Sequence, residues 1–179
     1  MKTTLMGQRS KDTKYCIRFT ESFPINIPAK MIDLQEWFAG MMETDYTSYS
    51  QAHIAMSSFS KDGILYTTNV ENIGTDQIVQ HYIMQHEAPD HVLLYSPDSV
   101  AYIMRFFPIT VGVPWEMQIR PVSKDASELV CLIGIDYPNK LIQIVYSLYG
   151  LGGLFLRKHL NKEGKAFAKD IEKKFNLKA

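Results

Sequence analysis

Residues 139–179 read NKLIQIVYSLYGLGGLFLRKHLNKEGKAFAKDIEKKFNLKA, and this stretch decides the fold. Asn139 is a suitable helix N-cap, and no charged residue occurs from 141 to 156, before a basic and polar tail begins at Arg157. At 100° per residue, one side of a continuous helix collects apolar side chains: Ile142, Val145, Tyr149, Leu156, Leu160, Phe167 and Ile171. The pattern therefore predicts one long terminal helix, straight or bent at its glycines, that packs on the rest of the protein through this side.

Three glycines share the apolar side of this helix, namely Gly152, Gly153 and Gly164. A glycine inside a helix costs roughly 1 kcal/mol relative to alanine, so inward-pointing glycines need a reason. They mark a kink, permit close approach of a neighbouring element, or leave room for a bound molecule. The same side carries one carboxylate, Glu163, and has His159 at its edge.

The composition is that of an ordinary globular protein. A length of 179 residues predicts one domain over 14–179, preceded by a flexible polar N-terminus over 1–13. Hydrophobic residues make up 46% of the chain and charged residues 21%. Basic and acidic residues number 19 each, so no overall field attracts nucleic acid or an anionic membrane, and no nucleic-acid partner is expected.

The positions of the two cysteines and the lack of long apolar segments predict where in the cell the protein lies. Cys16 and Cys131 both fall in expected strands, which suits free thiols in a reducing compartment better than a disulfide. Residues 1–7 contain no apolar core of a signal peptide, and 141–156 is shorter than the roughly 20 residues that cross a bilayer. We therefore expect a cytoplasmic protein without an integral membrane segment, while its oligomeric state stays open.

Most of the remaining chain alternates with period two, which is typical of strands. Residues 15–25 form the first strand, Pro28 opens a helix through about Met42, and 43–51 is a polar connector. Further strands are expected at 52–59, 64–70, 78–85, 91–96, 100–107, 113–120 and 129–137. This order predicts the α+β class, with a curved antiparallel sheet wrapped around the long terminal helix.

The whole pattern resembles the START/SRPBCC superfamily, which has the helix-grip fold and includes polyketide cyclases. The resemblance rests on Tyr15–Ile27 leading into Pro28–Ile32, on the closing strand Glu128–Tyr137, and on the terminal helix. It implies an apolar cavity between sheet and helix that takes a lipid, a polyketide or another small hydrophobic or aromatic molecule. It transfers no catalytic residue, because fold alone does not specify chemistry.

Aromatic, methionine and glycine residues are the candidate lining of that cavity. Alternate side chains of a strand face the same way. If the two expected strands pair simply, Tyr102, Met104 and Phe106 of one face the same way as Trp115 and Met117 of the other. Together they would form a wall suited to a flat apolar ligand. The candidate ligand-binding residues are Trp37, Tyr102, Met104, Phe106, Trp115, Met117, Tyr149, Gly152 and Gly153. Ordinary core packing is the competing interpretation.

A narrower resemblance is to diacetylphloroglucinol hydrolase and phloretin hydrolase, zinc enzymes that cleave a carbon–carbon bond at an aryl ketone. Their metal ligands are a histidine after a Trp/Tyr-rich helix, a glutamate before Ile-Gly, and a His-x-x-x-Glu pair on the terminal helix. The corresponding residues here, in the same order, are His53, Glu71, His159 and Glu163. The resemblance implies zinc at these residues, although this chain is shorter and lacks the arginine-rich strand that those enzymes carry before the terminal helix.

The His159–Glu163 pair separates the alternatives. Residues four apart on a helix face one another, and a solvated ion pair is the common interpretation. Glu163, however, lies near the middle of the apolar side, where an ionised carboxylate needs a partner. With a metal there, Tyr46 or Tyr49 of the connector would be near enough to polarise a substrate carbonyl if the connector folds over the mouth.

Three functions follow from these observations. The first is binding of a small hydrophobic molecule without any cofactor, which needs only the cavity. The second is a zinc-dependent hydrolase acting on an acylated phenol, and the third is an interaction domain with a filled core. The chain contains no nucleophile elbow, phosphate loop or dinucleotide-binding fingerprint.

Overall fold

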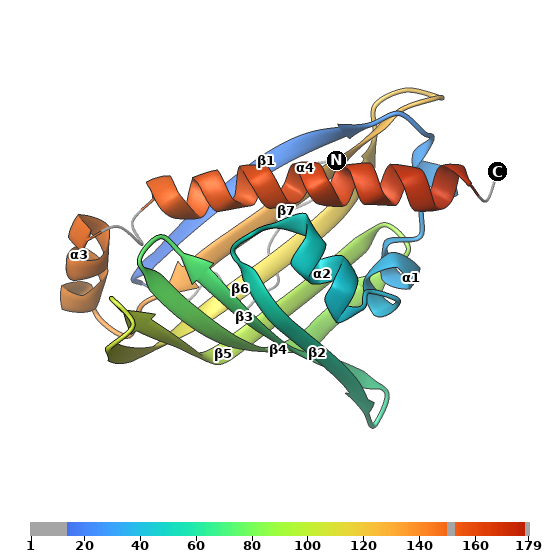
Figure 1. Cartoon of the computed structure of the whole chain (residues 1–179). Coiled ribbons are helices and arrows are strands. Elements are labelled where there is room, and N and C mark those ends of the chain that lie inside the picture. Colours follow the sequence, from blue (N-terminus) through green and yellow to red (C-terminus); the bar gives the residue numbers. More distant parts are fainter. Residues whose placement is uncertain (1–13, 150–152, 178–179) are drawn as a thin grey trace.

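The computed structural model describes residues 14–149 and 153–177 (Figure 1). The expected flexible segment 1–13 and Gly152 lie outside this part of the chain. In chain order the elements are β1 (Cys16–Ile25), the 3₁₀ helix η2 (Ala29–Met31), α1 (Leu34–Ala39), α2 (Glu43–Tyr49), β2 (His53–Lys61), β3 (Ile64–Ile73), β4 (Asp76–Ala88), β5 (His91–Ile103), β6 (Phe107–Pro121), β7 (Ser127–Asp136), α3 (Lys140–Tyr149) and α4 (Leu154–Asn176).

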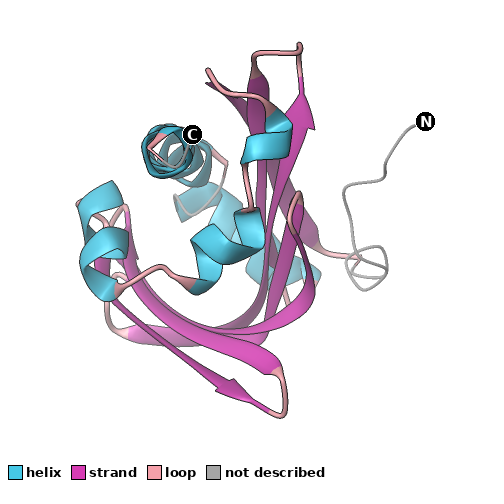
Figure 2. Ribbon diagram, turned by 90° about the vertical axis from the view of Figure 1, so that its right-hand side faces the viewer, coloured by secondary structure: helices cyan, strands magenta, loops and turns pink. Residues whose placement is uncertain are grey.

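The strands form a 7-stranded sheet in the order β1-β7-β6-β5-β4-β3-β2, and every neighbouring pair is antiparallel. The sheet curves strongly, and Figure 2 shows α4 end-on inside the curve, with the shorter helices on the same concave side. The α+β helix-grip architecture expected from the sequence is confirmed.

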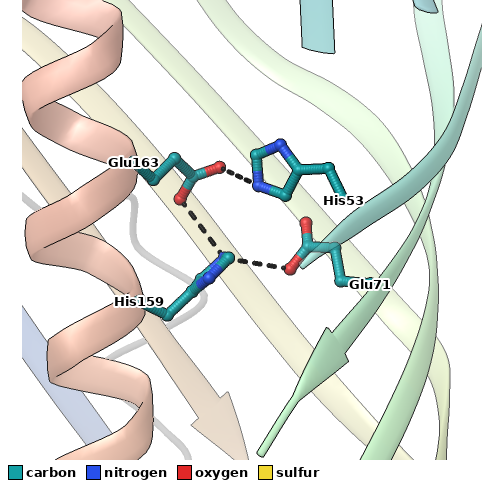
Figure 3. A group of neighbouring side chains, drawn as sticks. All are labelled: His53, Glu71, His159 and Glu163. Carbon is teal, nitrogen blue, oxygen red and sulfur yellow. Dashed lines mark ion pairs between the residues drawn. The ribbon is translucent and has the colours of Figure 1, made fainter. Parts of the chain in front are cut away.

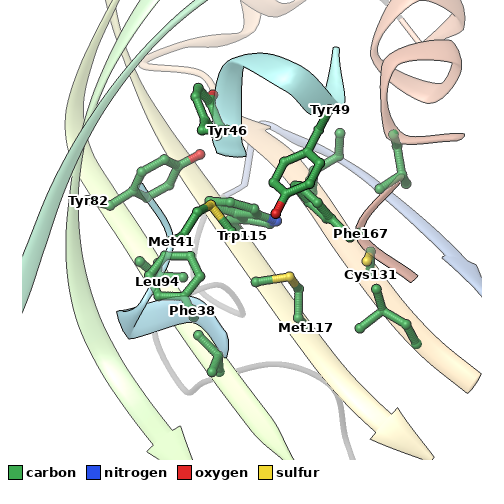
Figure 4. Close-up of a cluster of buried hydrophobic side chains, with 14 of the residues drawn as sticks. Phe38, Met41, Tyr46, Tyr49, Tyr82, Leu94, Trp115, Met117, Cys131 and Phe167 are labelled. Atoms are coloured by element: carbon green, nitrogen blue, oxygen red, sulfur yellow. The ribbon is translucent and has the colours of Figure 1, made fainter. Parts of the chain in front are cut away.

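The apolar side of α4 fills the concave face of the sheet. Leu160 and Phe167 are each 1% exposed and Ile171 is fully buried, which confirms the side of the helix that periodicity predicted. The close-up in Figure 4 shows Phe167 beside Trp115 of β6, and the two ring centroids are 5.8 Å apart. Burial of such large side chains contributes most of the stabilisation of a packed core, about 1.5–3 kcal/mol for each.

The terminal segment is two helices rather than the single helix expected from the sequence. Gly153 adopts φ 41°, a left-handed conformation that a continuous right-handed helix cannot contain, and α4 starts immediately after it. Glycine reaches this conformation without a Cβ clash, so the glycine-rich junction separates α3 from α4. Among the described residues, no helix is long and apolar enough to cross a membrane.

The expected connector 43–51 contains the helix α2, which the sequence analysis missed. Its composition is mostly polar, but Tyr46 is fully buried and Tyr49 is 8% exposed, so these two residues form its inward face. The Asp45 side chain accepts a hydrogen bond from the Met42 backbone N–H (3.2 Å) and caps the first turn. A two-residue inward face is too short to produce a detectable apolar period.

The break expected between the strands 91–96 and 100–107 is also absent, because β5 runs continuously from His91 to Ile103. Its pairing with β6 shifts between Ser96 and Ser99, as a β-bulge does. A bulge accommodates Pro97, which cannot donate a ladder hydrogen bond.

A partly buried polar network attaches the short helices to α4. The Asp170 carboxylate accepts hydrogen bonds from the Trp37 indole N–H and from the Tyr49 hydroxyl, both at 2.8 Å. Lys174 lies 3.1 Å from the same carboxylate. Burial alone would raise the pKa of Asp170, but these three partners outweigh it and lower that pKa below its ordinary value.

Gly164 is the point of closest approach between α4 and β1. A Cβ placed on Gly164 would overlap the ring of Phe23, which is 3% exposed and has little room to move. We expect Gly164→Ala to lower the free energy of unfolding by about 1–3 kcal/mol through overpacking, although alanine favours helices by about 1 kcal/mol. Denaturant unfolding measures the change.

Two further variants separate packing from helix propensity. Gly164→Ala combined with Phe23→Leu should recover most of the loss, since the smaller side chain removes the overlap. Lys165→Ala, at an exposed position of the same turn, should be nearly neutral. A Gly164→Ala protein as stable as the parent would contradict the close approach.

The Asp170 network makes a testable contribution to acid stability. Because the folded pKa is lowered, the carboxylate stabilises the protein above its unfolded pKa of about 4 and loses this effect as pH falls through the folded value. Asp170→Asn keeps an acceptor for Trp37 and Tyr49 but removes the charge. We expect parent and variant to differ in unfolding free energy at pH 7, and the difference to shrink below pH 4. A difference independent of pH would contradict the proposed role of the charge.

Candidate metal centre

Four side chains from three separate elements meet between α4 and the sheet (Figure 3). His53 begins β2, and Glu71 lies directly opposite it on β3 in the antiparallel register. His159 and Glu163 are one turn apart on α4, on the side that faces the sheet. One ligand-type atom from each of the four residues lies within 4.8 Å of all the others.

Each imidazole is directed at carboxylate oxygens. His53 Nε2 lies 3.2 Å from Glu163 Oε1. His159 Nε2 lies 3.2 Å from Glu71 Oε2 and 3.6 Å from Glu163 Oε2. Both Nε2 atoms are buried, and neither has a partner with hydrogen-bond geometry. The four groups therefore converge on one point rather than forming separate, well-directed hydrogen bonds.

Tyr46 of α2 orients two of the four side chains. His53 Nδ1 lies 2.7 Å from the Tyr46 carbonyl oxygen, which can only accept, so Nδ1 carries the proton and Nε2 presents its lone pair when the ring is neutral. The His53 ring also stacks on the Tyr46 ring, with centroids 4.0 Å apart and an interplanar angle of 5°. The Tyr46 hydroxyl donates a hydrogen bond to Glu71 Oε1, while Glu71 Oε2 faces His159. Such contacts behind the ligands are typical of metal sites.

The buried acidic and basic side chains of the cluster shift one another's pKa values. Burial lowers the pKa of His159, but the charges of Glu163 and Glu71 outweigh it and raise that pKa to about 9. Burial likewise raises the pKa of Glu71, but His159 and His53 outweigh it and lower that pKa to about 2. For His53, the interaction with Glu163 outweighs the effect of burial and raises the pKa. Two buried carboxylates thus require positive charge beside them.

The donor set fits a divalent cation of the zinc class. Two carboxylates balance a 2+ charge while both imidazoles remain neutral ligands. Tetrahedral bonds of about 2.0–2.1 Å place neighbouring ligand atoms roughly 3.3 Å apart. The three separations given above, 3.2 to 3.6 Å, are close to that value. Two nitrogen and two oxygen donors suit zinc, iron or manganese, whereas calcium and magnesium prefer oxygen alone.

A cavity of about 30 Å³ lies beside the cluster. Glu71, His159 and Glu163 form one side of it, and the remaining lining is mainly apolar: Ile73, Ile78, Gln80, Tyr82, Val113, Trp115, Ile133, Gly134, Ile135 and Leu156. Trp115 Nε1 and Gln80 Oε1 are buried without a hydrogen-bond partner. The volume suits one or two water molecules, so the cavity is smaller than the hollow expected from the sequence.

The structure brings the four expected metal ligands together but not the expected ligand-binding set. Trp37, Trp115 and Met117 are buried in the core, and of these only Trp115 lines the cavity. A Cβ on Gly153 would lie 3.5 Å from the Phe19 ring, and Gly153 does not line the cavity. The side chain of Tyr149 and all of Gly152 lie outside the described residues.

The expected wall of 102–106 with 115–117 is wrong. Met104 is 59% exposed and Phe106 is 80% exposed, because the chain turns at 104–106 between β5 and β6 instead of continuing as a strand. Met104 and Arg105 take positive φ there. Tyr102 is half-buried near the end of β5, where it pairs with Pro108.

The tyrosines also differ from expectation. The Tyr46 hydroxyl is bound to Glu71 and the Tyr49 hydroxyl to Asp170, so neither is free to polarise a substrate. Tyr82 and Gln80 of β4 line the cavity instead, and the sequence analysis did not single them out. Their alternation with Ile78 was the available signal, since all three share one face of β4.

Comparisons with known proteins identify the fold and no closer relationship. No family model matches the sequence, and no curated protein matches it. A START superfamily protein from Mycobacterium smegmatis is similar in structure, with a TM-score of 0.56 at 11% identity over 87% of this chain and 97% of that one. The Zhui aromatase/cyclase from Streptomyces sp. R1128 gives 0.59 at 8% identity, over 90% of this chain and 94% of that one.

Norcoclaurine synthase from Thalictrum flavum, in complex with dopamine and hydroxybenzaldehyde, gives a TM-score of 0.52 at 11% identity over 94% of each chain. At such low identity, these similarities concern the arrangement of the backbone and not the chemistry of the site. The chain has the helix-grip fold of the START superfamily.

Proposed function

We propose that this protein is a metal-dependent hydrolase that acts on a small acylated aromatic molecule, with a zinc-class cation held by His53, Glu71, His159 and Glu163. The observation that carries the proposal is the convergence of two imidazoles and two carboxylates within 4.8 Å in the interior. A buried cluster of four ionisable groups is expensive to maintain for stability alone, which favours a functional role.

The residues around the cluster suit this chemistry. A bound cation of this class polarises carbonyl oxygens and lowers the pKa of water. Tyr46 holds His53 and Glu71 in place, so the ligands need little reorganisation on binding. Trp115 presents an aromatic wall and an unpaired indole N–H, which would donate to a substrate oxygen. Gln80 Oε1 is an unpaired acceptor suited to a phenolic hydroxyl.

The size of the cavity requires movement when such a substrate binds. The cavity has room for only one or two water molecules, and an aryl ketone is larger than that, so lining side chains must shift. Leu156 is the best-placed of these, because it lies in the first turn of α4, next to the break at Gly153. The side chains of Ile73 on β3 and Ile135 on β7 also line the cavity, so the surface around Leu156 is apolar.

Binding of a hydrophobic molecule without metal is the second candidate. It is supported by the mainly apolar lining and by a fold that the Zhui aromatase/cyclase and norcoclaurine synthase also have. A filled core with an interaction role is favoured only by the small cavity volume. Metal content distinguishes the first candidate from the other two.

Metal analysis is the decisive experiment. We expect protein purified without chelator, or incubated with Zn²⁺ and dialysed, to retain about one metal ion per chain by elemental mass spectrometry. Glu163→Gln should lose most of this metal while keeping the shape of the side chain. His81→Ala, which removes an exposed histidine of β4, is the matched control and should bind as the parent does.

A second measurement guards against loss of fold. Circular dichroism and thermal unfolding of Glu163→Gln should remain cooperative, because the substitution removes a buried charge without creating a cavity. If the folded parent retains no stoichiometric zinc, iron, manganese or cobalt, the hydrolase proposal fails and metal-free binding becomes the better candidate.

Tyr46 provides an independent test of the site's design. Tyr46→Phe keeps the ring that stacks on His53 and the backbone carbonyl that orients it, but removes the hydroxyl bonded to Glu71. We expect metal affinity to fall about 10–100-fold, as is usual when a group behind a ligand is lost. Tyr82→Phe, an equally buried tyrosine that orients none of the four ligands, should change affinity little. Equal losses in both variants would show a general packing effect.

A further inference from the structure

One end of the molecule carries an unusual concentration of exposed apolar side chains. Met104, Phe106 and Phe107 lie at the β5–β6 turn, with exposed fractions of 59%, 80% and 65%. Leu141 of α3 is 69% exposed, and Leu154 at the start of α4 is 83% exposed. Figure 1 shows α3, the start of α4 and the β5–β6 turn together at the left end. We name the segments 104–107, 140–144 and 154–158 the apolar rim.

Contacts through the β3–β4 turn place two of these segments, 104–107 and 154–158, close together. The Met104 backbone N–H donates to Asp76 Oδ1 at 2.7 Å, which ties the β5–β6 turn to the start of β4. A Cβ on Gly74, in the turn just before β4, would lie 3.5 Å from the ring of Phe155. The β3–β4 turn therefore bridges the β5–β6 turn and the start of α4.

The β5–β6 turn presents its apolar side chains in a strained conformation. Met104 and Arg105 have φ of 49° and 67°, values that glycine or asparagine adopts at much lower cost. The hydrogen bond to Asp76 holds the turn in this shape. The large side chains of this turn are exposed and contribute nothing to the core. Their presence in a strained turn therefore indicates a contact with another molecule.

The charges of the rim have one sign. The three segments contain Arg105, Lys140, Arg157 and Lys158, all exposed, and no aspartate or glutamate. Arg157 is paired with Glu21 of β1 (Nε to Oε1 2.6 Å). The equal numbers of basic and acidic residues predicted no attraction to an anionic membrane. The structure nevertheless has a local excess of cations around the apolar side chains of the rim.

We propose that the apolar rim docks this protein on an anionic lipid surface. Exposed Phe and Leu side chains enter the headgroup and acyl boundary, while arginine and lysine beside them pair with lipid phosphates. A helical partner protein would require an apolar groove with a complementary acidic border, whereas the exposed apolar side chains of the rim lie on three separate segments. Leu156, one residue from Phe155, lines the internal cavity, so docking brings the cavity to the membrane. The inference does not depend on the metal centre.

Vesicle co-sedimentation tests the proposal with the full chain. We expect binding to phosphatidylcholine vesicles that contain phosphatidylglycerol, weaker binding to phosphatidylcholine alone, and a decrease as salt is raised. Phe106→Ser should weaken the partition coefficient about tenfold. Arg105→Gln should weaken it about fivefold on the anionic vesicles only, as loss of one cation near such a surface does.

Phe59→Ser is the matched control. Phe59 is 58% exposed on the β2–β3 hairpin, which lies away from the rim in Figure 1, and it stacks on Tyr66. This variant should bind vesicles as the parent does, and thermal unfolding should show that all variants are folded. Absence of parent binding to both kinds of vesicle, or equal losses in the Phe106 and Phe59 variants, would overturn the proposal.

A second copy of the chain is the other possible occupant of the rim. Sedimentation velocity of the parent and of Phe106→Ser, both without lipid, distinguishes it. We expect the same sedimentation coefficient for both proteins. A parent dimer that Phe106→Ser dissociates would assign the rim to self-association and overturn lipid docking.

Discussion

The close packing of α4 across the concave face of the sheet is the contact on which the rest of the structure depends. At Gly164 the helix backbone approaches the Phe23 ring so closely that no side chain fits between them. This approach sets the depth of the helix, and Phe167 and Ile171 then fill the interior further along. Since Glu163 is the neighbour of Gly164, the same contact determines how far one carboxylate reaches toward β2 and β3.

Burial of the four ionisable side chains follows from that depth. Each of them would be costly to bury alone in this interior, but pairing of opposite charges offsets the cost. Glu163 and Glu71 raise the pKa of His159, and the histidines lower the pKa of Glu71. Apolar residues of similar volume commonly stabilise such positions as well or better. The cluster is therefore better explained by the chemistry it permits than by stability.

The internal cavity and the solvent-exposed apolar rim lie close together along α4 but face different directions. Along the concave face, the cavity beside the cluster is small and mainly apolar. A short distance along α4, Leu154 and Phe155 face solvent at the apolar rim, while Leu156 between them and the cluster faces inward. One turn of helix thus connects the proposed docking surface with the proposed site, because successive helical residues point in different directions.

The sequence by itself determined the α+β class, the antiparallel sheet and the inward side of α4, because side-chain periodicity reports directly which face of an element is buried. It also placed His159 and Glu163 on one helix face, while His53 and Glu71 came from a resemblance and not from periodicity. Only the tertiary structure decided that these four meet. Their meeting depends on the His53–Glu71 register, on the depth of α4 at Gly164 and on Tyr46, which lies on a helix too polar to be recognised. Distances between elements arise from packing of residues far apart in the chain, and no local pattern records them.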